Sequence, residues 1–122
     1  MQLQFRSRDR QAQHLRGWAL LRAKFVLRRM AWRVSHASVQ LSDVDGPRHG
    51  VDKRCQVSIL ATDGAPVVVS ATARDWPTAL NQALTRALAV LKRLFLRAQQ
   101  ARRTQRLFIR NDRASGALNQ TA

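Results

Sequence analysis

A chain of 122 residues, 45% of them hydrophobic, is long enough for one domain with a buried core and too apolar for a disordered basic tail. The formal net charge is +15 and all seven acidic residues are Asp, so internal ion pairs cannot neutralise the 22 Lys and Arg side chains. The remaining positive field predicts a polyanionic partner, and nucleic acid is favoured over an anionic membrane or an acidic protein.

The N-terminal third is predicted to hold one strand and one long helix. Residues 1–6 alternate apolar and polar, which is typical of a half-buried strand. Asp9 can cap a helix that runs from about residue 11 to residue 32. At about 100° per residue, this helix has one apolar stripe with Trp18 beside it. The stripe consists of Leu15, Ala19, Val26 and Met30.

Three further strands are predicted in the middle of the chain, because the hydrophobic period falls to two. They cover residues 34–42, 55–61 and 66–72. A loop with Gly and Pro at residues 43–53 separates the first two, and a tight turn at residues 62–65 joins the last two. The side chains expected to face inward are Ala37, Val39, Leu41, Cys55, Val57, Ile59, Ala61, Val67, Val69 and Ala71.

A second helix follows Asp75, which is a good N-cap, and Pro77 is tolerated in its first turn. Its packed part is expected to end near Ala101. Residues 1–103 are then expected to form one α+β domain, and residues 104–122 a flexible basic tail. The apolar stripe of this helix is Leu80, Ala83, Leu84, Ala87, Leu91, Leu94, Phe95 and Ala98.

The predicted order is β-α-β-β-β-α, an α+β fold. A two-layer sandwich, in which both helices cover one face of a four-stranded sheet, buries both apolar stripes.

The basic residues fall into groups that suit RNA phosphates. One strip lies on each predicted helix, and a third group lies at one end of the sheet. If the helices pack side by side, their strips form one basic surface without a base-reading motif, which favours recognition of folded RNA by shape. The candidate RNA-binding residues are Arg22, Lys24, Arg28 and Arg29 on the first helix, Arg86, Lys92, Arg93 and Arg97 on the second, and Lys53 and Arg54 near the sheet.

Residues that could support catalysis or bind a metal form no recognisable site. His14, His36 and His49 are scattered, and Asp43 and Asp45 lack the further oxygen ligands of a calcium loop. We therefore expect no enzymatic activity, cofactor, metal or small-molecule substrate. The absence of a signal peptide and of a membrane-spanning run predicts a cytoplasmic protein with no membrane partner.

The stretch from Val39 to Cys55 resembles the strand–loop–strand signature of the proteobacterial ribosome hibernation-promoting factors, which belong with the ribosome-associated inhibitor A proteins. Residues 71–75 with Ala79, Leu80 and Ala83 resemble the family's entry into its second helix. Leu15, Trp18, Ala19 and Arg22 match the first helix. The likeness spans about residues 1–103 and has the family's element order.

This resemblance implies a short-form hibernation factor of stress and stationary phase. It would bind 16S rRNA of the 30S subunit or 70S ribosome near the decoding region and silence idle ribosomes. Family basic positions correspond to Arg22, Arg86, Lys92, Arg93 and Arg97. Family members usually carry Glu on their helices, and this chain has none.

Two other readings follow from the residues themselves. Charge alone fits a general nucleic-acid or nucleoid protein. The apolar residues Leu20, Phe25 and Leu27 lie outside the stripe of the first helix, and they could form a membrane-facing or partner-binding patch.

Overall fold

The computed structural model describes residues 1–43 and 53–120, with side chains described as far as residue 107. The chain divides into two units, Met1–Leu91 and Lys92–Ala122. Residues 44–52, which hold most of the predicted loop and of the family-like signature, lie outside the described residues.

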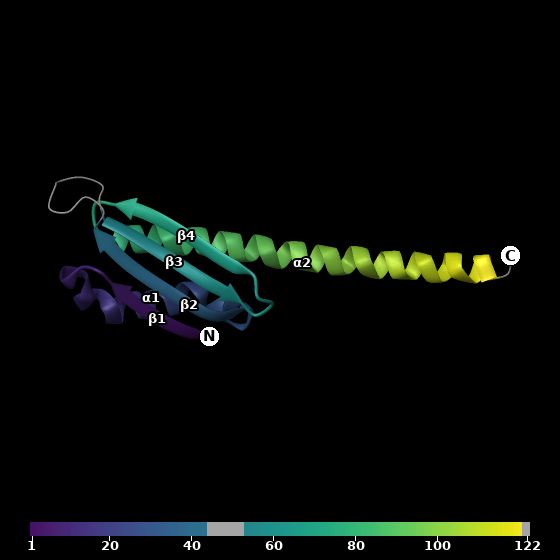
Figure 1. Cartoon of the computed structure of the whole chain (residues 1–122), viewed down its shortest axis with the longest axis horizontal. Helices are drawn as coiled ribbons and strands as arrows, with labels where there is room; N and C mark the ends of the chain where they lie inside the picture. The colour runs from purple at the N-terminus through teal and green to yellow at the C-terminus, as the bar shows by residue number, and fades with distance from the viewer. Residues whose placement is uncertain (44–52, 121–122) are drawn as a thin grey trace. The chain divides into compact units, whose positions relative to one another are not determined.

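The first unit contains a four-stranded sheet in the order β1-β2-β3-β4 (Figure 1). Strand β1 pairs in parallel with β2, and the other two pairs are antiparallel. The predicted strands are therefore confirmed. Their bounds are Gln2–Ser7 (β1), Val34–Asp43 (β2), Lys53–Ala61 (β3) and Pro66–Ala73 (β4).

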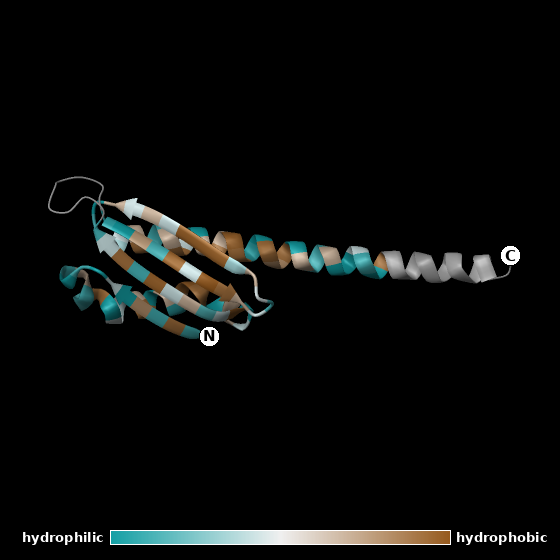
Figure 2. Cartoon of the chain, in the orientation of Figure 1, coloured by the Kyte–Doolittle hydropathy of each residue, from teal (hydrophilic) through white to brown (hydrophobic). Residues whose placement is uncertain are grey.

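Hydrophilic and hydrophobic residues alternate along β2 and β3, as the colours in Figure 2 show, and their burial alternates in the same way. The register places Leu41 beside Cys55 and Cys55 beside Ala71, and all three side chains are buried. All the side chains expected to face inward are buried, except Val69, which is half-buried. The predicted turn between β3 and β4 is also confirmed: Gly64 has a φ of 90° there, a conformation that glycine adopts without strain.

The first helical segment has three parts: a 3-10 turn at Arg10–Leu15 (η1), an α-helix at Arg16–Leu27 (α1) and a second 3-10 turn at Arg28–Arg33 (η2). Asp9 caps it, because its Oδ1 accepts a hydrogen bond from the N–H of Gln11 at 2.9 Å. The prediction of one uniform helix was therefore wrong at both ends.

The apolar face of α1 is also rotated from the predicted stripe. Leu27, predicted to lie outside it, is fully buried, whereas Trp18 is 38% exposed. The small side chains Ala19 and Ala23 face the core with Leu27, and small residues let a helix approach a sheet closely. The larger Val26 is displaced to a half-buried position.

Helix α2 runs from Trp76 to Gln120. As predicted, Asp75 caps it, since the N–H of Thr78 donates to Asp75 Oδ1 at 2.7 Å. Both α1 and the first part of α2 lie against the same face of the sheet (Figure 1), which confirms the two-layer α+β fold. Within the first unit, α2 buries Trp76, Ala79, Leu80, Ala83, Leu84, Ala87 and Leu91.

In the second unit, Leu94, Phe95 and Ala98 are half-buried, and every side chain from Gln99 to Leu107 is exposed. This agrees with a packed part that ends near Ala101. The backbone, however, stays helical to Gln120, because residues 92–115 contain no Gly or Pro and are rich in Ala, Leu, Arg and Gln. The boundary at residue 103 and the flexibility of the tail stay predictions.

Candidate nucleic-acid interface

Helices α1 and α2 are positively charged because they carry many Lys and Arg side chains and almost no acidic residue. Helix α1 has none, and α2 has none before residue 112. The four Asp residues whose side chains the structure describes all have local structural partners. These pairs are Asp9 with the N–H of Gln11 at 2.9 Å, Asp43 with Lys53 at 2.6 Å, Asp63 with Arg33 at 3.6 Å, and Asp75 with the N–H of Thr78 at 2.7 Å.

At α1 and the start of η2, the structure brings two of the predicted cations to one aromatic ring, and a third, Lys24, lines the same surface hollow. The guanidinium of Arg28 lies 4.0 Å from the centre of the Phe25 ring, and its Nη1 donates to the Phe25 carbonyl at 3.0 Å. The guanidinium of Arg22 lies 5.6 Å from the same ring. A surface hollow of about 600 Å³ is lined by Trp18, Leu21, Arg22, Lys24, Phe25 and Arg28. Arg29 is exposed nearby in η2.

Arg22 and Arg86 lie on different sides of α2. Arg22 is half-buried, and its Nε donates to Asn81 Oδ1 on α2 at 2.9 Å. Arg86 donates from Nη1 to the carbonyl of Ser70 at 2.7 Å, on the edge strand β4. Positions 81 and 86 are about 140° apart around a helix. A single surface that joins the α1 cations to Arg86 therefore stays a prediction.

At the end of the sheet, Lys53 and Arg54 have different environments. Lys53 donates to Asp43 and lies 4.7 Å from the Trp76 ring centre, and its side chain is only 21% exposed. The indole N–H of Trp76 in turn donates to the Ser42 carbonyl at 3.1 Å. This contact network gives Lys53 a structural role.

Arg54, by contrast, is exposed, and it lines a hollow of about 310 Å³ with Arg8, Asp9, Ser42 and Asp43. Arg8 was missed from the sequence because β1 had to be paired with β2 before it could be placed at this end of the sheet.

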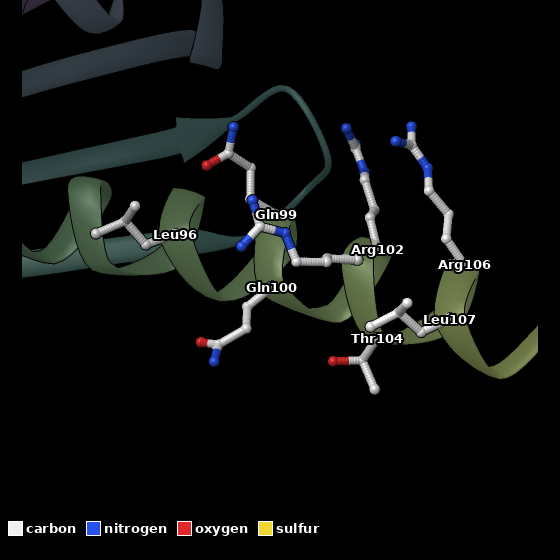
Figure 3. A pocket seen from close by; sticks show the side chains of 8 residues that line it. Leu96, Gln99, Gln100, Arg102, Thr104, Arg106 and Leu107 are labelled. Atoms are coloured by element: carbon white, nitrogen blue, oxygen red, sulfur yellow. The ribbon is translucent and has the colours of Figure 1, made fainter.

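In the second unit, Lys92, Arg93 and Arg97 are all exposed. Sequence reasoning missed a further basic cluster, Arg102, Arg103 and Arg106, which lines a hollow of about 650 Å³ with polar and apolar neighbours. Figure 3 shows Arg102 and Arg106 pointing in the same direction from successive turns. Their spacing of four residues was the available signal, but assigning residues 104–122 to a tail obscured it.

The described residues show no arrangement typical of a metal or redox site. Residues 1–43 and 53–107 contain no group of three His, Cys, Asp or Glu side chains that could bind a metal ion. Burial raises the pKa of Cys55 from 9.0 to about 12, so this thiol is protonated at neutral pH. Within the described part, no helix is long and apolar enough to cross a bilayer.

Comparisons with known proteins give a fold but no close relative. No protein-family model matches the sequence, and no curated protein matches it. Among solved structures, the crystal structure of the Thermus thermophilus Protein Y N-terminal domain is similar, with a TM-score of 0.58 and 19% sequence identity. The match covers 77% of this chain and 99% of that chain. The chain therefore shares the fold of the Protein Y N-terminal domain.

Proposed function

We propose that this protein is a cytoplasmic, non-enzymatic ribosome hibernation factor that binds 16S rRNA of the 30S subunit or 70S ribosome near the decoding region. The observation that carries the proposal is that α1, and α2 before residue 112, contain no acidic residue, while exposed cations lie beside the Phe25 ring of α1. The β-α-β-β-β-α order, which is also that of the resembling hibernation factors, and the likeness to Protein Y support the ribosomal reading over general nucleic-acid binding.

The positions of two arginines suit binding to phosphate. Asn81 fixes Arg22, and the Phe25 ring and carbonyl fix Arg28. Because each guanidinium is held before binding, less side-chain entropy is lost when it meets a phosphate. Lys24 adds a further positive charge to the same surface hollow.

The proposed RNA-binding set keeps nine of the ten predicted positions. Lys53 is left out, because Asp43 and Trp76 hold it at the sheet. The set consists of Arg22, Lys24, Arg28, Arg29, Arg54 and Arg86 in the first unit and Lys92, Arg93 and Arg97 in the second.

Sedimentation with purified ribosomal particles tests the proposal. We expect the protein to sediment with 30S or 70S particles at low salt and to be released at high salt, because phosphate contacts displace counterions. An excess of duplex DNA should leave most of the protein on the particles. Release by DNA would support general nucleic-acid binding instead, and failure to sediment at low salt would overturn the proposal.

Charge reversal on α2 tests the contribution of that helix. Arg86→Glu with Arg93→Glu should abolish sedimentation with ribosomes. The matched control is Arg6→Glu with Arg74→Glu, which reverses two exposed arginines outside both helices. Equal binding by the two double variants would contradict a role for α2.

A further inference from the structure

The face of α1 that points away from the protein core carries exposed apolar side chains. Trp18, Leu21 and Phe25 follow one another at spacings of three and four residues, so they share one helix face. Their exposed fractions are 38%, 70% and 55%. This face is opposite the buried Ala19, Ala23 and Leu27. We refer to Trp18, Leu21 and Phe25 as the α1 ridge; contiguous exposed apolar side chains of this kind are typical of a binding surface.

Cations lie on both sides of the ridge. The guanidinium of Arg28 covers the Phe25 ring at 4.0 Å, and that of Arg22 lies 5.6 Å from it. Lys24 lines the same hollow. An occupant must therefore offer apolar surface to the ridge and negative charge to its borders.

We infer that the α1 ridge is a stacking platform for unpaired bases of the bound RNA, with the flanking cations on the adjoining phosphates. This inference rests on the proposed function, which supplies the RNA. Aromatic rings and guanidinium planes stack on nucleobases, and single-stranded loops present such bases. From Trp18 to Phe25 the helix rises about 10 Å, comparable to roughly three nucleotides at about 3.4 Å each.

Charge argues against a second copy as the occupant. Two ridges in contact would bring two sets of Arg22, Lys24 and Arg28 together, and each chain carries a net charge of +15. An RNA strand supplies one phosphate for each base, so its bases can meet the apolar ridge while its phosphates meet the flanking cations.

Paired variants separate stacking from simple apolar contact. Trp18→Leu with Phe25→Leu keeps an apolar ridge but removes both aromatic planes. The probes are a single-stranded uridine decamer and inorganic polyphosphate. We expect the decamer to bind the double variant about 5-fold to 150-fold more weakly, the loss typical of one stacked base. Polyphosphate should bind both proteins equally.

Fluorescence locates the contact. In a Trp32→Phe background, the decamer should quench the emission of Trp18, while the buried Trp76 is shielded. Polyphosphate should produce no quenching. An undiminished affinity of the leucine variant for the decamer, or equal quenching by polyphosphate, would overturn the inference.

Two further outcomes would assign the ridge to another partner and overturn the inference. One is flotation with vesicles of phosphatidylglycerol that is lost in Trp18→Ser with Phe25→Ser. The other is tighter binding of an acidic helical peptide than of the decamer. Sedimentation of the unmodified protein with ribosomes tests the proposed function separately. If the unmodified protein sediments with ribosomes but the stacking tests give the contradicting results, only the inference is wrong.

Discussion

Two groups of basic side chains in the first unit differ in their exposure to solvent and in whether a carboxylate lies beside them. At the sheet ends, Lys53 and Arg33 each have a carboxylate partner, Asp43 at 2.6 Å and Asp63 at 3.6 Å, and both basic side chains are largely buried. Lys24 on α1 and Arg28 at the start of η2 are exposed, and neither element contains an acidic residue. The comparison teaches that net charge alone does not identify a binding surface, because part of the charge supports the fold.

Among the variants that compare these two groups, charge reversal at Lys24 and Arg28 should give the largest effect on binding. For Lys24→Glu with Arg28→Glu we expect roughly 100-fold weaker binding to ribosomal particles, since hydrogen bonds to charged groups contribute about 1.5 to 3 kcal/mol each. The free energy of unfolding should change little. Binding is measured by sedimentation at several salt concentrations, with Arg6→Glu and Arg74→Glu as the charge-matched control.

Removal of the Lys53 charge should lower the stability of the fold and leave ribosome binding unchanged. Lys53→Met leaves the 13% exposed carboxylate of Asp43 without this partner. The expected loss of stability is about 2 to 4 kcal/mol, near the range for breaking a buried ion pair. Ribosome affinity should be almost unchanged. Urea denaturation measures the loss.

Lys24→Met is the matched control for Lys53→Met, because it removes an exposed lysine and should shift the free energy of unfolding by less than about 0.5 kcal/mol. Equal destabilisation by the two variants would remove the distinction between the groups.

The buried thiol of Cys55 should make the free energy of unfolding decrease at alkaline pH. Burial raises the pKa of Cys55 from 9.0 to about 12, so the neutral thiol stabilises the folded state below pH 9 and this contribution is lost as the pH rises toward 12. The decrease should be about 1 kcal/mol between pH 9 and pH 10. Urea denaturation at both values, with Cys55→Ala as reference, measures it. An identical decrease in both proteins would show that other groups cause it.

The smallest effect should come from Asp75. Its hydrogen bonds with Thr78 lower the pKa of the carboxyl below its usual 3.8. The charged form therefore stabilises α2 above pH 3.8, and this contribution is lost as the pH falls through the lower folded-state pKa. Asp75→Asn keeps a capping oxygen but cannot titrate. Its unfolding free energy should depend less on pH below 4 than that of the unmodified protein, as measured by denaturation at pH 3 to 5.

The strands and caps were predictable from the sequence because they depend on local rules. Alternation fixes which side chains of β2 and β3 face the core, and Asp9 and Asp75 stand directly before helical residues. Which face of α1 packs against the sheet was not predictable in this way. Packing against the sheet selected Ala19 and Ala23 for the close contact, whereas the large side chains Trp18 and Val26 dominate a hydrophobic pattern.

The candidate site could be predicted in composition but not in detail. The cations of α1 follow from the sequence, yet the stacking of Arg28 on Phe25 requires their rotamers. The pairing of Lys53 with Asp43 requires the β2–β3 register, which joins residues on either side of a loop. Phe25 lies outside the predicted apolar stripe, and only the structure shows that its ring lies near the guanidinium groups of both Arg22 and Arg28.

The hydrogen bond from Arg86 to Ser70 has a consequence for solubility. Strand β4 is an edge of the sheet, and its unpaired carbonyls could accept a strand from another molecule. Arg86 occupies one of these acceptors with a charged group, and Pro66 offers no N–H at the start of the strand. Replacing Arg86 by an apolar residue such as Met would expose this edge to strand addition, detectable as light scattering on concentration. We therefore expect Arg86 also to protect the sheet from aggregation.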